Sequence, residues 1–132
     1  IDFARRDRDG LLMAPAFAGS RMLADAGLTW QDFDIYEIHE AFAAQVLATL
    51  KAWESAEFCR DRLGRETPLG SIDRSKLNIK GGSLAMGHPF AATGARVLAN
   101  AAKLLAERGE GRALISVCTA GGMGVTAILE AA

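Results

Sequence analysis

Residues 33–53 read FDIYEIHEAFAAQVLATLKAW, and this stretch decides the fold. Its first part, 33–38, is rich in isoleucine, tyrosine and phenylalanine, which favour β-strands. From Phe42 onward, large apolar residues recur at helical spacing. The pattern predicts a strand that leads directly into a helix, with His39 and Glu40 at the junction.

The segment before this stretch is predicted to be helical. Pro15 can open a helix, small and apolar residues recur at helical spacing after it, and Gly27 can end it. We interpret residues 1–14 as the tail of a preceding segment and 15–132 as one incomplete domain. The chain starts at Ile1 without a methionine, which indicates that sequence is missing upstream.

The segment after it begins with a polar excursion at 54–76, where glycine and proline interrupt any periodicity. Phe58 and Leu63 can anchor one short helix within it. Leu77–Ile79 is a brief strand candidate, and an amphipathic helix is predicted over 91–108.

Two strands are predicted near the end of the chain, at 113–117 and 125–129, and the glycine-rich turn between them makes them antiparallel neighbours. The other strands are joined by helices and should be parallel. We therefore expect an α/β fold with a mixed, mostly parallel sheet and helices on both faces.

Composition excludes several classes of protein. The 132 residues are 50% hydrophobic and 23% charged, with a formal net charge of -1, which is typical of a globular domain with a real core. Near the start, charges of both signs alternate, so a nucleic-acid partner is not expected. The alternating residues are Asp2, Arg5, Arg6, Asp7, Arg8 and Asp9. No apolar run is long enough for a membrane span, and the first residues carry charge where a signal peptide would be apolar, so we expect a cytoplasmic protein.

Three reactive side chains follow predicted strands. His39 comes after the strand ending at Ile38, His88 lies in the loop after Ile79, and Cys118 follows 113–117. Ligands of open parallel sheets bind outside the carboxyl ends of the strands, so these side chains should converge there. A thiol beside an imidazole can act as an acid, a base or a nucleophile.

The residues next to these side chains fit such a site. Gly87 and Pro89 restrict the backbone on either side of His88. The turn after Cys118 is almost free of side chains, so its N–H groups are open to a substrate and can stabilise an oxyanion.

Simpler interpretations stay open. The glycine-rich turn can be only a tight hairpin, and a cysteine at a strand end can be only a small buried hydrophobe. We expect Cys59 to be structural, and Glu40 to complement a helix dipole rather than act as a base. We expect the polar helix face around Arg96 and Lys103 to be solvated.

Three ordered motifs resemble the thiolase family. They are Asn78-x-x-Gly81-Gly82-Ser83-x-Ala85-x-Gly87-His88-Pro89 with Ala92-Thr93-Gly94-Ala95-Arg96, then Cys118-Thr119-Ala120-Gly121-Gly122-Met123-Gly124, and His39-Glu40-Ala41-Phe42-Ala43. The last is similar to the family's NEAF block in its HEAF form. The likeness runs from about Pro15 to Glu130 and implies the C-terminal half of a thiolase-like fold without its first, central strand.

The resemblance implies thiolysis of 3-ketoacyl-CoA or the reverse Claisen condensation. His88 would activate a nucleophilic cysteine of the N-terminal half, and Cys118 would be the general acid/base. His39 would stand where most relatives use Asn to hold a catalytic water. The backbone N–H groups of Ala120, where many relatives have Gly, and of Gly121 would help form a second oxyanion site.

Further expectations concern ligands and partners. We expect Ser83, Gly87 and Met123 to bind substrate, with coenzyme A thioesters as substrates, no bound cofactor and no metal. The family implies a homodimer or tetramer, and the HEAF block with the 54–76 excursion resembles thiolases of β-oxidation complexes, which suggests a hydratase/dehydrogenase partner subunit. This chain alone would be inactive.

Three alternative functions compete with this interpretation. His39, His88 and Cys118 can together be ligands of a zinc ion. A ketoacyl synthase also uses histidine at this edge, but it places histidine where Cys118 stands. A degenerate thiolase-like domain can serve as a lipid-binding or assembly module without catalysis.

Overall fold

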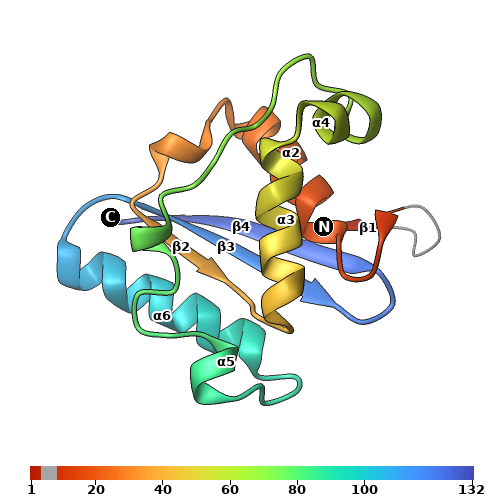
Figure 1. Cartoon of the computed structure of the whole chain (residues 1–132). Coiled ribbons are helices and arrows are strands. Elements are labelled where there is room, and N and C mark those ends of the chain that lie inside the picture. Colours follow the sequence, from red (N-terminus) through yellow and green to blue (C-terminus); the bar gives the residue numbers. More distant parts are fainter. Residues whose placement is uncertain (4–8) are drawn as a thin grey trace.

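The computed structural model describes residues 1–3 and 9–132 (Figure 1). Residues 4–8, which hold most of the alternating charges noted above, lie outside the described residues. In chain order the described elements are β1 (Asp2–Phe3), α2 (Ala14–Ala26), η1 (Trp30–Asp32), β2 (Ile35–Ile38), α3 (Ala43–Glu54), α4 (Ala56–Leu63), η2 (Arg74–Lys76), α5 (Ser83–Met86), α6 (Thr93–Arg108), β3 (Arg112–Thr119) and β4 (Met123–Glu130).

The described strands form one mixed sheet in the order β1, β4, β3, β2. β2 pairs with β3 in parallel, with Ile38 opposite Ser116. β3 and β4 are antiparallel, as predicted, with Thr119 opposite Met123 across the connecting turn. β1 adds a second antiparallel pairing at the edge of β4, so the parallel share of this sheet is smaller than expected.

The strand predicted at Leu77–Ile79 is absent, and a single parallel bridge between Leu77 and Tyr36 stands in its place. Asn78 has a φ of 47°, which an extended strand does not allow. Its side-chain amide donates to the Ile38 carbonyl at 2.9 Å, and its Oδ1 accepts from the Ile38 N–H at 2.8 Å. At this point the amide therefore replaces the backbone of a neighbouring strand.

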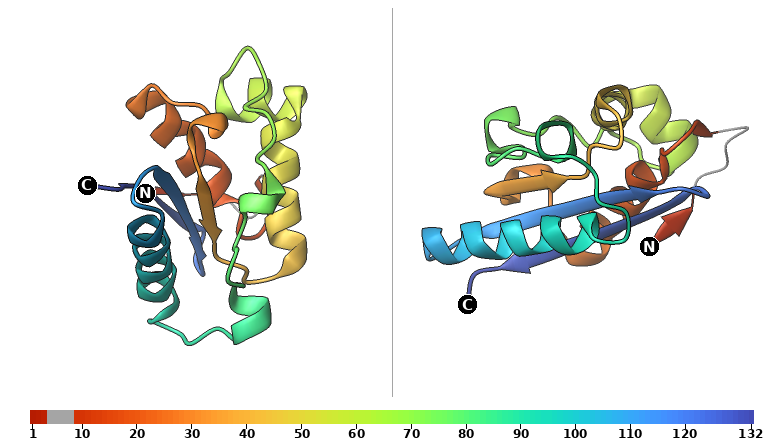
Figure 2. Two further views of the ribbon diagram at one scale, coloured as in Figure 1. Left: turned by 90° about the vertical axis from the view of Figure 1, so that its left-hand side faces the viewer. Right: turned by 90° about the horizontal axis from the view of Figure 1, so that it is seen from below.

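Helices cover both faces of the sheet, as predicted, in three layers (Figure 2). On one face, α2 and α3 enclose a core that contains Tyr36, Trp30 and Trp53. On the other face, α6 packs against a second cluster that contains Ile35. Successive residues of β2 thus point to opposite faces, and burying each large apolar side chain contributes about 1.5–3 kcal/mol.

The ends of the helices follow the local sequence. α2 ends at Gly27, whose φ of 67° is left-handed, and α6 ends at Gly109 with a φ of 79°. α6 begins at Thr93, later than predicted, because Ala91 has a φ of 65° and cannot be helical. The polar excursion contains the expected short helix, α4, whose N-terminus is capped by the Ser55 hydroxyl.

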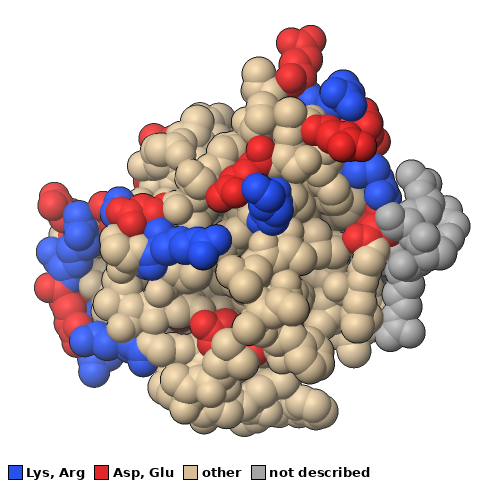
Figure 3. Space-filling view, viewed as in Figure 1, with Lys and Arg blue, Asp and Glu red and all other residues tan. Residues whose placement is uncertain are grey.

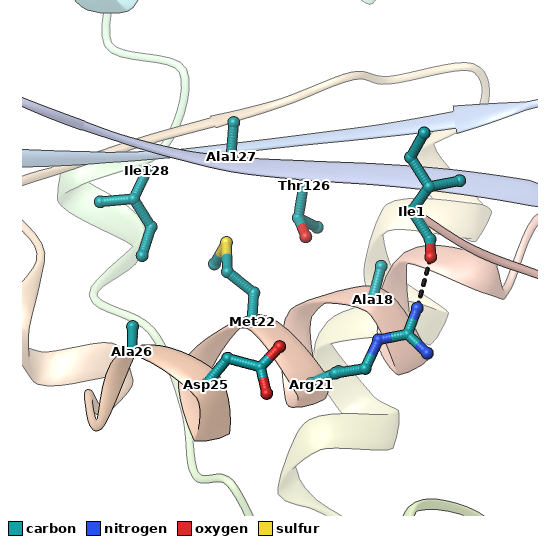
Figure 4. Close-up of a pocket in the computed structure, with 9 residues that line it drawn as sticks. All are labelled: Ile1, Ala18, Arg21, Met22, Asp25, Ala26, Thr126, Ala127 and Ile128. Carbon is teal, nitrogen blue, oxygen red and sulfur yellow. Dashed lines mark hydrogen bonds between the residues drawn. The ribbon is translucent and has the colours of Figure 1, made fainter.

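A hollow of about 460 Å³ lies between α2 and β4 (Figure 4). Arg21 crosses its rim and donates a hydrogen bond to the carbonyl of Ile1 (Figure 4). The residues that line it are Ile1, Ala18, Arg21, Met22, Asp25, Ala26, Thr126, Ala127 and Ile128. None of the side chains expected to be reactive is among them.

The helices of the described residues do not include a membrane-spanning one. Across 1–3 and 9–132, every helix is too short or too polar to cross a bilayer.

Glu37 of β2 gives a pH-dependent prediction of stability. It is 1% exposed, and its Oε1 has no hydrogen-bond partner among the described residues. Burial raises the pKa of Glu37 from 4.5 to about 7, with Glu40 adding to the rise and Arg96 opposing it. Because the folded pKa is the higher one, the protonated carboxyl favours the folded state at low pH, and this stability is lost as the pH rises through 7.

We therefore expect the free energy of unfolding of Glu37→Gln, relative to that of the parent, to increase as the pH rises. The gain should be larger by about 2–3 kcal/mol at pH 8 than at pH 5, as measured by urea unfolding. Glu110→Gln, at an exposed position, is the matched control. An equal stability difference at both pH values would contradict the argument.

Candidate functional site

His39 lies directly after β2 and is held by its backbone and its side chain. Its N–H donates to the Ser116 carbonyl of β3 at 2.8 Å, which continues the parallel pairing by one residue. The imidazole is 3% exposed, and its Nδ1 lies 3.0 Å from the Ser83 hydroxyl at the start of α5. His39 is therefore a fixed group of the protein interior rather than a mobile surface side chain.

Glu40 joins the end of β2 to the segment that carries His88. Its Oε1 accepts from the side chain of Asn78 at 2.8 Å, and its Oε2 accepts from the Leu84 N–H at 3.0 Å. A Cβ atom on Gly82 would lie 2.3 Å from Oε2, so only glycine fits beside the carboxylate. Glu40 thus complements the start of a helix, as expected, but that helix is α5 rather than α3, which follows it in sequence.

His88 lies against His39, with the two ring centroids 4.4 Å apart. Its Nδ1 lies 2.6 Å from the Thr93 hydroxyl, and that hydroxyl is 3.2 Å from the Pro89 carbonyl. Thr93 has one hydroxyl proton, so both bonds exist together only if Thr93 donates to Pro89 and the His88 Nδ1–H donates to Thr93. In the neutral imidazole this arrangement places the single proton on Nδ1, so that Nε2 can act as a base.

The turn before His88 depends on glycine. Gly87 has a φ of 88° and a ψ of 168°, a conformation that is essentially restricted to glycine. Its carbonyl accepts from the Arg96 guanidinium at 3.0 Å. Gly87 therefore shapes the backbone that presents His88, and its predicted contact with substrate stays a prediction.

Cys118 lies on β3, next to the strand that leads to His39, but it turns to the other face of the sheet. Its Sγ is buried and lies 3.5 Å from the Oε1 of Gln45 on α3. It alternates with Val117, which packs on the α6 side. The structure thus brings His39 and His88 into contact and places Cys118 at the same end of the strands, facing α3.

Burial shifts two pKa values at this site. It lowers the pKa of His39, and the charges of His88 and Arg96 lower it further. It raises the pKa of the Cys118 thiol, although the backbone N–H groups of Cys118 and Ala41 oppose the rise. At neutral pH His39 is therefore a neutral imidazole and Cys118 a protonated thiol, which suits a proton donor better than a ready-made thiolate.

The turn after Cys118 combines a left-handed backbone with tight packing. Gly121 and Gly122 both have a φ of 87°, and Ala120 is exposed between the strands. Met123 begins β4 and is half-buried. Gly124 serves packing instead, because a Cβ there would lie 2.6 Å from the backbone of Ala14. The predicted roles of Ala120, Gly121 and Met123 toward a substrate stay predictions.

Sequence reasoning missed Arg96 and Gln45. Arg96 was expected on a solvated helix face, but it is half-buried, and its guanidinium donates to the Ser83 hydroxyl at 3.0 Å. The signal was its place in the first turn of the helix after His88. Lys103 on the same helix is exposed and lies 3.9 Å from Glu107, as expected for a solvated face.

The surface around α5, next to His88 in the chain, carries little charge (Figure 3) and exposes large apolar side chains. In that view the region over α5 is almost entirely uncharged, with a single acidic patch. Phe90 is 84% exposed, its ring centroid lies 4.7 Å from that of His88, and Leu84 and Met86 are also exposed. An apolar ligand, or another part of a longer protein, would find a matching surface here.

The same residues do not form a metal site. In the part of the chain that the structure describes, no three His, Cys, Asp or Glu side chains are grouped so that they could hold a metal ion. A zinc site made by His39, His88 and Cys118 therefore has no geometric support.

Similar proteins were found by sequence. The chain is 51% identical over 120 residues to a 3-ketoacyl-CoA thiolase of Aeromonas salmonicida, covering 91% of this chain and 28% of that protein. It is 46% identical over 128 residues to a probable 3-ketoacyl-CoA thiolase of Caenorhabditis elegans, covering 97% of this chain and 29% of that protein. The chain thus spans less than a third of the length of these relatives.

Solved structures agree in fold. Human mitochondrial 3-ketoacyl-CoA thiolase superposes with a TM-score of 0.78 at 31% identity, covering 99% of this chain and 28% of that one. Peroxisomal 3-ketoacyl-CoA thiolase of Saccharomyces cerevisiae gives 0.70 at 36% identity, covering 93% and 30%.

A family model covers almost the whole chain. The model for the thiolase C-terminal domain matches residues 2–131. Together with the α/β fold and the ordered motifs around His39, His88 and Cys118, this match shows that the chain belongs to the thiolase family, as a part of its C-terminal domain.

Proposed function

We propose that the protein containing this chain is a 3-ketoacyl-CoA thiolase, which cleaves 3-ketoacyl-CoA with CoA or runs the reverse condensation. The observation that carries the proposal is the contact between His39 and His88, in which Thr93 leaves one ring nitrogen of His88 free as a base. In this proposal the chain supplies the acid–base groups, and a cysteine upstream of it supplies the nucleophile.

His88 would begin the reaction. Its unprotonated Nε2 accepts the proton of the upstream cysteine, and the thiolate attacks the 3-keto carbon of the substrate. The bond between C2 and C3 then breaks, which leaves an acyl-enzyme and the enolate of acetyl-CoA. The exposed apolar surface around Phe90 lies beside His88 and supports a place for the acyl chain.

Cys118 would move the second proton. Its raised pKa keeps the thiol protonated, so it can donate to C2 of the enolate and release acetyl-CoA. The resulting thiolate accepts the proton of an incoming CoA thiol, whose sulfur attacks the acyl-enzyme. The bond between the acyl group and the upstream cysteine then breaks, the shortened acyl-CoA is released, and the cysteine thiolate takes its proton back from His88. Both protons are thereby accounted for, and no bound cofactor is required.

Negative charge develops on the substrate oxygen during the reaction, and hydrogen-bond donors must stabilise it. We assign one site to His39, directly or through a water, and a second to the backbone N–H groups of Ala120 and Gly121. We include Gly87 and Met123 among the residues near the substrate.

Finer assignments belong to the same proposal. We propose that the enzyme acts in fatty-acid β-oxidation in the cytoplasm, as a homodimer or homotetramer, with a hydratase/dehydrogenase subunit as a possible partner. We also propose that residues 15–132 form the incomplete C-terminal domain and residues 1–14 the tail of the segment before it. The HEAF block and the polar excursion at 54–76 support the choice of subfamily.

Replacing Cys118 tests the proton-transfer role. In the intact enzyme, Cys118→Ala should lower kcat for thiolysis roughly 10²- to 10⁴-fold, because a general acid/base is lost. Cys59→Ala is the matched control, since the Cys59 thiol is buried against the carbonyls of Ala52 and Trp53 in the last turn of α3. The control should lose stability but keep kcat, and equal activity of Cys118→Ala and the parent would refute the assignment.

Replacing His88 tests the activation of the nucleophile. His88→Ala should slow the alkylation of the upstream cysteine by iodoacetamide at neutral pH roughly 10-fold or more, because no base accepts its proton. Mass spectrometry of the modified peptide over time measures the rate. An unchanged alkylation rate would show that His88 does not act on that cysteine.

The isolated chain gives a third test. The 132 residues by themselves should show no thiolysis of acetoacetyl-CoA, since the proposed nucleophile lies outside them. The assay follows loss of the 3-ketoacyl-CoA absorbance in the presence of CoA. Turnover at the rate of the intact enzyme would contradict the division of roles proposed here.

A further inference from the structure

Arg96 connects three parts of the site. It lies in the first turn of α6, and its guanidinium donates to the Gly87 carbonyl and to the Ser83 hydroxyl, each at 3.0 Å. Ser83 is buried, and its hydroxyl oxygen also lies 3.0 Å from Nδ1 of His39. A continuous hydrogen-bonded chain therefore runs from a fixed positive charge, through a hydroxyl, to an imidazole.

The direction of the hydrogen bonds follows from the donors that are present. Arginine can only donate, so the Ser83 oxygen accepts from Arg96. The Ser83 proton then needs an acceptor in a buried place, and Nδ1 of His39 is the acceptor within reach among its hydrogen-bond contacts. If Ser83 donates to Nδ1, the single proton of neutral His39 is on Nε2.

We propose that Arg96 and Ser83 are positioning residues that hold His39 neutral, with its proton on Nε2, so that His39 presents a hydrogen-bond donor beside the unprotonated Nε2 of His88. The use of that donor for a substrate oxygen or a water rests on the proposed thiolase function. The proton placement itself does not.

The charges around His39 agree with a neutral ring. The titratable and charged groups that face it are His88, Arg96 and Glu40. Burial lowers the pKa of His39 first, and His88 and Arg96 lower it further, while Glu40 opposes them. Glu40 already accepts two hydrogen bonds, from Asn78 and Leu84, so it is poorly placed to draw a proton onto His39.

The hydrogen-bonded chain Arg96–Ser83–His39, called the relay from here on, changes the expected role of Ser83. The sequence suggested that Ser83 binds substrate, but its side chain is 7% exposed and its oxygen already has two partners. A hydroxyl in this position acts through His39 rather than by touching a ligand. Arg96, expected at a solvated surface, becomes the residue that orients this hydroxyl.

The two histidines are then held with opposite proton placements. Thr93 keeps the proton of His88 on Nδ1, whereas Ser83 keeps the proton of His39 on Nε2. Adjacent rings would repel each other if both were cationic. One imidazole that donates through Nε2 and one that accepts through Nε2, with ring centroids 4.4 Å apart, can instead act on different atoms of one substrate.

The direct test is nitrogen NMR of the intact enzyme labelled with ¹⁵N-histidine. His39 is assigned by the loss of its signals in His39→Asn. In the parent, we expect His39 to show an unprotonated, hydrogen-bonded Nδ1 and a protonated Nε2 at neutral pH. In Ser83→Ala the two nitrogen signals should move toward an averaged mixture of tautomers, and in Arg96→Ala the pKa of His39 should rise.

Activity is measured on the same variants. Ser83→Ala should lower kcat/KM for thiolysis roughly 10- to 100-fold, less than the loss of an oxyanion donor itself, because the donor remains but is no longer oriented. Ser83→Thr keeps a hydroxyl and should restore most of the activity and the parental nitrogen signals. Lys103→Gln, at an exposed position on α6, is the matched control for Arg96→Ala. It should change neither the activity nor the nitrogen signals of His39.

The outcomes separate the two proposals. A protonated Nδ1 on His39 in the parent, or unchanged nitrogen signals in Ser83→Ala, overturns the relay whether or not the enzyme is active. Absence of thiolysis in a folded parent that shows the expected signals overturns the proposed function and leaves the proton placement standing. Circular dichroism of each variant identifies any loss of activity that comes from unfolding.

Discussion

The site depends on the pairing of the Asn78 side chain with the backbone of Ile38. The amide satisfies the N–H and the carbonyl of a strand residue that is 40 positions away in sequence. Each such bond contributes only about 1 kcal/mol net, but leaving a buried backbone group unpaired costs about 1–3 kcal/mol. The loop after Asn78 is thereby fixed to the end of β2, and α5 brings Ser83 beneath His39.

From this attachment the electrostatics of the site follow. Because α5 and the first turn of α6 close over the end of β2, His39 is buried next to Arg96, and both burial and charge keep it neutral. His88 stays at the surface and is oriented through Thr93. One imidazole is thus part of the interior and the other is open to a ligand, although their rings are in contact.

Sequence patterns predicted most of the fold because helices and long strands carry their own periodicity. α2, α3, α6, β2 and the β3–β4 hairpin were all expected close to their observed positions. The failure at Leu77–Ile79 had a specific cause, since a left-handed Asn78 uses its side chain where a strand would use its backbone. The strand propensity of a three-residue segment cannot predict a hydrogen bond between a side chain and a distant backbone.

The site was predictable in part for the same reason. Both histidines and Cys118 were expected at the carboxyl ends of strands, and a parallel β2–β3 pair with His39 at its end agrees with that rule. Successive side chains of a strand point to alternate faces of the sheet, so the face toward which Cys118 points depends on whether β3 extends as far as this residue. The orientation of Cys118 toward Gln45 was therefore not foreseen. The Arg96–Ser83 contact joins two helices, and composition alone does not distinguish it from a solvated helix face.

The orientation of Cys118 also limits where a substrate can lie. The histidine pair opens on the α6 side of the sheet, whereas the Cys118 thiol points to α3 beside Gln45 and the Ala41 N–H. A ligand that reaches both must therefore cross the ends of β2 and β3, over the strand termini, rather than enter a pocket on one face. The hollow between α2 and β4 lies on a different part of the molecule, and neither of the two histidines nor Cys118 lines it.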